Sequence, residues 1–98
     1  MKILKEQAAK TLILTLEGRL DTTTSPELEA LLVNELGDTT ELILDLDHLE
    51  YISSAGLRVL LTAQKMMNTR GTMIVRNVCE AVREVFEITG FTDILTIQ

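Results

Sequence analysis

The sequence has little of the residues that define several classes of protein. It contains one cysteine, Cys79, among 98 residues, so neither a disulfide within the chain nor a cysteine cluster for zinc is available. No apolar run approaches the roughly 20 residues that a membrane-spanning helix needs. Charged side chains at Lys2, Lys5 and Glu6 also interrupt any signal-peptide-like segment. These absences exclude a disulfide-stapled secreted mini-protein and favour a cytoplasmic location.

Aromatic and basic residues are scarce as well. Aromatics make up 3% of the chain, with no Trp, and nine Lys and Arg stand against fifteen Asp and Glu, for a net charge of −6. Binding to nucleic acid needs clustered Lys and Arg that neutralise phosphates. Base-stacking surfaces also need aromatic side chains. We therefore expect no direct nucleic-acid partner and no membrane partner.

The charges that are present are unevenly distributed. Residues 1–50 hold eleven acidic and four basic residues, whereas residues 51–98 hold four acidic and five basic ones. Between Tyr51 and Cys79 every charged residue is basic, namely Arg58, Lys65, Arg70 and Arg76. The asymmetry is either chance in a short chain or a surface that steers one protein partner, and the sequence alone leaves both interpretations open.

The apolar pattern predicts one α/β domain over residues 1–98. Residues that alternate apolar and polar indicate strands, and apolar residues spaced by three and four indicate helices. The predicted strands are 2–7, 11–17, 41–46, 72–76 and 94–97, and the predicted helices are 25–36, 54–69 and 78–89. The order β-β-α-β-α-β-α-β predicts a mixed sheet with helices packed on it.

Local signals place the helix starts and the loops. Pro26 suits a first helical position with Ser25 as its cap, although Thr24 and Glu27 offer a competing capping box. Asn77 is the expected cap of the last helix. The segment 47–51 is expected to be a loop.

The most informative stretch is Ser53-Ser54-Ala55-Gly56, which combines two hydroxyls with two very small residues. It lies at a predicted junction between a strand and a helix, on the edge of an open sheet where ligands and partners usually bind. A purely structural interpretation accounts for these residues: one serine caps the helix, and Gly56 allows close packing. The same arrangement also exposes a hydroxyl at a helix start.

Three other chemistries have weaker support. A serine hydrolase would need a glycine before the nucleophile, which is missing, and would have to use His48, the one histidine, as its base. Asp45, Asp47 and His48 could be metal ligands, but no further ligand cluster is visible, so we expect no metal and no cofactor. Cys79 is expected to be a small buried apolar residue.

Three segments together resemble the STAS domain of bacterial anti-sigma factor antagonists. The first is Gly18-Arg19-Leu20-Asp21, similar to the family's G-x-L-D. The second runs from 42–46 through 51–57, similar to a strand followed by D-S-[ST]-G-[LI], which Ser53-Ser54-Ala55-Gly56-Leu57 matches. The third joins 71–75 to 85–91. The resemblance covers nearly the whole chain. It departs from the family at Ser53, which stands where the family has Asp.

The resemblance implies a regulatory binding protein rather than an enzyme. Its partner would be an anti-sigma factor that is also a serine kinase, and binding would release a sigma factor. Phosphorylation of Ser54, with Ser53 as second choice, would end the binding, and a serine phosphatase would reverse it. The implied partner surface is Asp21, Thr22, Ser53, Ser54, Ala55, Gly56 and Arg58. The family also implies a monomer.

Two rival functions remain open from the sequence. One is a STAS interaction subunit that is never phosphorylated, for example in a lipid transporter. The presence of Ser53 where the family has Asp leaves this function possible. The other is a small serine-dependent enzyme or phosphoryl carrier that depends on His48.

Overall fold

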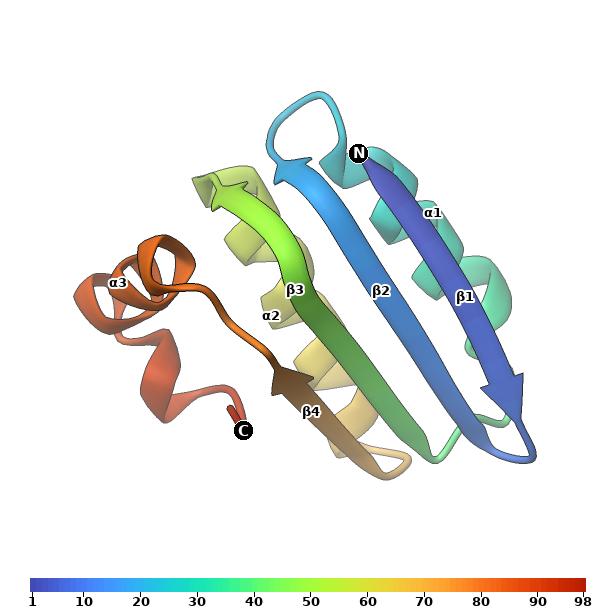
Figure 1. Cartoon of the computed structure of the whole chain (residues 1–98). Helices are drawn as coiled ribbons and strands as arrows, with labels where there is room; N and C mark the ends of the chain where they lie inside the picture. Colours follow the sequence, from blue (N-terminus) through green and yellow to red (C-terminus); the bar gives the residue numbers. More distant parts are fainter.

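A four-stranded mixed sheet organises the computed structural model, which describes residues 1–98 (Figure 1). Its strands lie in the order in which they occur along the chain: β1 (Lys2–Ala8), β2 (Thr11–Leu20), β3 (Glu41–Ile52) and β4 (Thr72–Arg76). The first two strands pair antiparallel, whereas the other neighbours pair parallel. Parallel neighbours require crossover connections, and helices supply them here.

Three helices complete the fold, and they lie on one face and one edge of the sheet. They are α1 (Ser25–Glu35), α2 (Ser54–Asn68) and α3 (Glu80–Thr89), followed by the short 3₁₀ helix η1 (Phe91–Asp93). Figure 1 shows α1 and α2 behind the sheet, with α3 beyond the β4 side. The predicted fold class, an α/β domain with helices packed on a mixed sheet, is confirmed.

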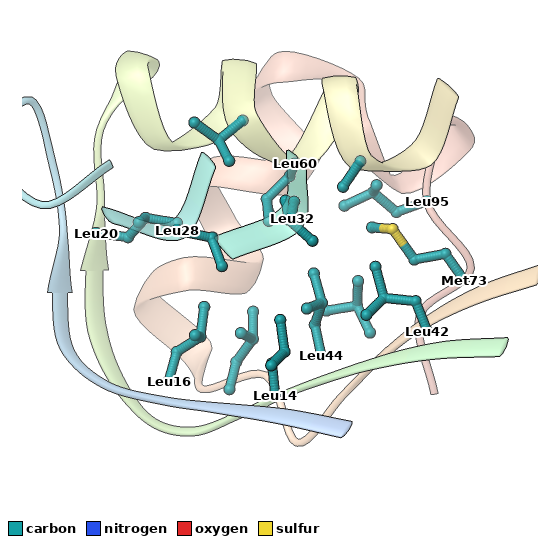
Figure 2. Close-up of a cluster of buried hydrophobic side chains, with 14 of the residues drawn as sticks. Leu14, Leu16, Leu20, Leu28, Leu32, Leu42, Leu44, Leu60, Met73 and Leu95 are labelled. Atoms are coloured by element: carbon teal, nitrogen blue, oxygen red, sulfur yellow. The ribbon is translucent and has the colours of Figure 1, made fainter. Parts of the chain in front are cut away.

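Alternating leucines of the two central strands build the core. Leu14 and Leu16 of β2 and Leu44 of β3 are fully buried, and Figure 2 shows them pointing toward Leu28 and Leu32 of α1. Burying one such side chain stabilises the fold by roughly 1.5–3 kcal/mol. Because the core contains buried residues of β2, β3, α1 and α2, it fixes where each of these strands ends relative to the helix that follows.

Strands β2 and β3 are longer than their apolar patterns indicate. The predicted strand 11–17 continues to Leu20, and the predicted loop 47–51 belongs to β3. The register between the two strands shifts between Thr15 and Glu17 and again between Gly18 and Arg19. Each irregularity breaks the period-two alternation of apolar and polar residues. The alternating pattern in the sequence therefore ends before the strand does.

Three details differ from expectation, two in the C-terminal third and one at the start of α1. Asn77 does not cap α3, because it adopts a left-handed φ of 58° and Cys79 occupies the N-cap position instead. The predicted strand 94–97 is reduced to one parallel bridge between Val75 and Ile97. At α1, Thr24 is the N-cap and Ser25 begins the helix. None of the helices combines the length and the apolar composition that spanning a membrane requires.

The core makes a direct prediction. Leu44→Ala should lower the free energy of unfolding by about 2–5 kcal/mol, because it removes a fully buried side chain and leaves a cavity. Val33→Ala is the matched control, since Val33 is 66% exposed on α1. Urea denaturation followed by circular dichroism measures both changes, and equal effects of the two substitutions would contradict this description of the core.

Candidate functional site

The start of α2 lies directly against the end of β2. The Ser53 N–H donates to the Leu20 carbonyl oxygen at 2.9 Å, which ties the two chain segments together. A Cβ atom on Gly56 would lie 2.8 Å from that same oxygen and 2.9 Å from Leu20 Cγ. Only a glycine therefore allows this approach without a shift of the backbone or of neighbouring side chains, which gives Gly56 a definite structural role.

The two adjacent serines have different environments. Ser53 is the N-cap of α2, with extended backbone, and its Oγ accepts from the Gly56 N–H at 3.4 Å. Ser54 is the first residue of the helix and is exposed. No side-chain hydrogen bond involves its hydroxyl. The capping role expected for one serine thus belongs to Ser53, and the Ser54 hydroxyl remains accessible.

The loop after β2 is organised by the carboxylate of Asp21. Its Oδ1 accepts from the Thr23 N–H at 3.0 Å, from the Thr23 hydroxyl at 2.8 Å and from the Thr24 N–H at 3.1 Å. The Thr23 hydroxyl bond is the main cause that holds the pKa of Asp21 below its usual range. Asp21 therefore shapes its own loop and makes no hydrogen bond to Ser54.

Two residues that the sequence did not single out lie at the same end of the sheet. Arg19 and Tyr51 are register partners on β2 and β3, and the Arg19 guanidinium lies 4.1 Å from the centroid of the Tyr51 ring. Arg19 Nε is also 3.8 Å from Asp21 Oδ2. The two residues are paired because both strands extend beyond their apolar runs.

A shallow hollow joins three of the predicted partner-binding residues. It has a volume of about 250 Å³ and lies between the first turns of α1 and α2. Its lining residues are Thr22, Ser25, Pro26, Glu29, Ala55, Arg58 and Val59. Thr22 therefore contributes to one surface with Ala55 and Arg58, which lie more than 30 residues later on α2 beside Ser54.

The residues proposed for the weaker alternatives lie elsewhere. His48 Nε2 is 3.5 Å from Asp47 Oδ2 on β3, and no hydrogen bond joins it to Ser54. Asp45 is engaged by the side chains of Arg76 and Asn77. Burial would raise the pKa of Asp45, but these bonds and the Asp47 N–H outweigh that effect and lower it. No group of three or more potential metal ligands occurs.

The cysteine is tied to the strand beside it. Cys79 is half-buried, and its Sγ–H donates to the Leu49 carbonyl oxygen at 3.3 Å. The thiol thus packs α3 against β3 from the N-cap position.

The sequence model of the STAS domain matches residues 2–98. This chain belongs to the STAS domain family. The match includes β2, β3, the start of α2 and the loop of Asp21, so it spans every element of the site described above.

Relatives with assigned names are similar over almost the entire chain. BtrV of Bordetella bronchiseptica, a candidate anti-sigma factor antagonist, is 37% identical over 99 residues, which cover 99% of this chain and 85% of BtrV. The anti-sigma-B factor antagonist of Listeria monocytogenes is 30% identical over 97 residues, covering 97% of this chain and 85% of the relative.

Solved structures share the fold. The anti-sigma factor antagonist SpoIIAA in its unphosphorylated form superposes with a TM-score of 0.77 at 20% identity, covering 99% of this chain and 87% of SpoIIAA. SpoIIAA of Bacillus in its phosphorylated form gives the same TM-score at 21% identity, with coverage of 99% and 91%. At this identity the likeness establishes the fold alone.

The loop carboxylate predicts a pH-dependent stability. The pKa of Asp21 is lower in the folded chain than its ordinary value of 3.8, so its stabilising effect is full above that value and is lost as the pH falls through the folded pKa. Asp21→Asn should therefore lower the free energy of unfolding at neutral pH, and the difference from the unmodified chain should shrink below about pH 4.

Asp38→Asn is the control for this prediction. Asp38 is an exposed aspartate in the turn before β3 and accepts no side-chain hydrogen bond. Urea denaturation across acidic pH measures both variants, and a deficit of Asp21→Asn that is the same at every pH would show that the Asp21 charge is not responsible.

Proposed function

We propose that this protein is a cytoplasmic anti-sigma factor antagonist switched by phosphorylation of Ser54. In its unmodified form it binds an anti-sigma factor that is also a serine kinase, and this binding releases a sigma factor. The kinase transfers a phosphoryl group to Ser54, and the complex dissociates. A serine phosphatase removes the phosphate and restores binding, so the chain is a substrate and a switch rather than a catalyst.

The observation that carries the proposal is the exposed, unbonded hydroxyl of Ser54 at the start of α2. Ser53, the other candidate, is half-buried and holds the Gly56 N–H as the helix cap. A kinase must reach the acceptor oxygen, and the neighbouring Ala55 and Gly56 add almost no bulk around it. The names of the relatives in Bordetella and Listeria support the same function.

A phosphate on Ser54 would act chiefly at the interface with the partner. It adds about −1.5 to −2 charges and three acceptor oxygens. The first turn of a helix tolerates such a charge because its free N–H groups and dipole favour anions. A tenfold loss of affinity needs only about 1.4 kcal/mol, which steric clash and desolvation of one charged group at an interface supply.

Ser53 in place of the family's Asp favours one distinct alternative, a STAS interaction subunit that is never phosphorylated. The capping function explains why Ser can stand there, since Ser and Asp are both preferred N-cap residues. The substitution therefore conserves the helix start while removing one negative charge beside the acceptor.

Phosphorylation should map to Ser54. We expect one phosphate on the intact chain after incubation with Mg-ATP and extract of its own host, none on Ser54→Ala, and one again on Ser53→Ala. The physical reason is that, of the two adjacent serines, Ser54 has the exposed hydroxyl free of intramolecular bonds, whereas Ser53 is half-buried and caps the helix. Intact-mass spectrometry with site mapping checks all three proteins.

The Ser53 variant also controls for loss of structure. Removing the N-cap oxygen should lower the free energy of unfolding by about 1 kcal/mol, without preventing phosphorylation. Phosphate on Ser54→Ala would reassign the acceptor. An unmodified chain that still captures an anti-sigma factor would identify the interaction subunit instead.

A further inference from the structure

Arg58 is an exposed arginine on α2 that has no acidic partner. The ion pairs of the molecule are Lys5–Glu35, Arg19–Asp21, His48–Asp47 and Arg76–Asp45. Arg70, another base of the same stretch, donates to the Gly37 carbonyl oxygen. Arg58 therefore differs from Arg19, Arg70 and Arg76 in having its whole guanidinium available.

No carboxylate of the chain forms an ion pair with Arg58. The sequence of α2 contains no acidic residue. Asp21, in the adjacent loop, is committed to Thr23, Thr24 and Arg19. Glu29 lines the same hollow from α1 but forms no ion pair with Arg58. The guanidinium of Arg58 thus enters no ion pair within the chain and is free to contact an outside group.

The position of Arg58 relates it directly to Ser54. The two residues are four apart on one helix, a spacing that places side chains on the same face about 5–6 Å apart at Cβ. An anion at the earlier position and a cation at the later one is the favourable order for such a pair. A phosphate on Ser54 would therefore find Arg58 within reach, without any movement of the backbone.

We propose that Arg58 binds one of two anions at a time, so that binding of one excludes the other. In the unmodified chain its guanidinium contacts an acidic group that the partner inserts into the hollow between α1 and α2. After phosphorylation it forms an ion pair with the phosphate on Ser54 instead. This inference rests on the proposed function, because it concerns the same acceptor and the same partner.

The coupling adds an attractive component to the switch. Phosphorylation would not only place a negative charge at the interface but would also withdraw the positive charge that the partner uses. Because guanidinium and phosphate groups form charge-assisted, bidentate hydrogen bonds, the intramolecular pair competes effectively for the arginine. Arg58 would thereby be a positioning residue for the phosphate and a recognition residue for the partner.

The phosphate arm is tested on the full chain with phosphoserine installed at position 54 by genetic code expansion, so that no kinase is needed. Phosphorus NMR titration measures the second pKa of the phosphate, which is ordinarily about 6. Arg58→Ala should raise that pKa by roughly 0.2–0.4 pH units, and Arg58→Lys should raise it less. Lys65→Ala, an exposed base near the far end of α2, should leave it unchanged.

The partner arm is tested on the unmodified chain with the anti-sigma factor of the same host. Arg58→Ala should weaken binding roughly five- to tenfold, with partial recovery in Arg58→Lys and no effect of Lys65→Ala. Equal phosphate pKa values in Arg58→Ala and Lys65→Ala, or full-strength partner binding by Arg58→Ala, would overturn the inference. Absence of phosphate on Ser54 after kinase treatment would instead count against the proposed function, and the two failures are therefore distinguishable.

Discussion

The close contact between the start of α2 and the end of β2 is the constraint on which the site depends. It consists of the Ser53 N–H bond to the Leu20 carbonyl and the lack of a side chain at Gly56. Because β2 also leads into the Asp21 loop, this contact holds the loop and the helix start at one end of the sheet. The buried leucines on both strands pack beneath that end, so a surface assembled from distant residues forms without a deep cleft.

Some polar side chains of the site form hydrogen bonds within the chain, and others beside them form none. Ser53 satisfies a helix N–H while Ser54 next to it stays free. The Asp21 carboxylate accepts hydrogen bonds from its own loop, whereas the Arg58 guanidinium forms no ion pair. The Ser54 hydroxyl is therefore accessible at the start of α2, next to a serine whose side chain serves the helix.

The sequence predicted the fold class and most element positions, because alternating leucines in β2 and β3 report directly on burial. It predicted strand ends poorly, since the register shifts near Glu17 and Gly18 disturb that alternation without ending the strand. Asn77 was wrong as a helix cap because the chain turns through a left-handed conformation there and begins α3 later. Such a backbone choice depends on tertiary contacts that no local pattern contains.

For the site, motif residues were predictable and their environments were not. The short stretch around Ser54 and the loop of Asp21 stood out by composition and by resemblance. Which serine caps the helix, and the contact between Arg19 and Tyr51, depended on how two strands align. The hollow that unites Thr22, Ala55 and Arg58 likewise arises from helix packing, which a linear pattern does not specify.

The central claim is that one phosphate at position 54 separates this protein from its partner. Isothermal titration calorimetry of the full chain, with either serine or encoded phosphoserine at position 54, against the anti-sigma factor of its host measures that claim directly. We predict binding at least about tenfold weaker for the phosphorylated chain, with the fold unchanged by circular dichroism. Equal affinity of the two forms would contradict the account.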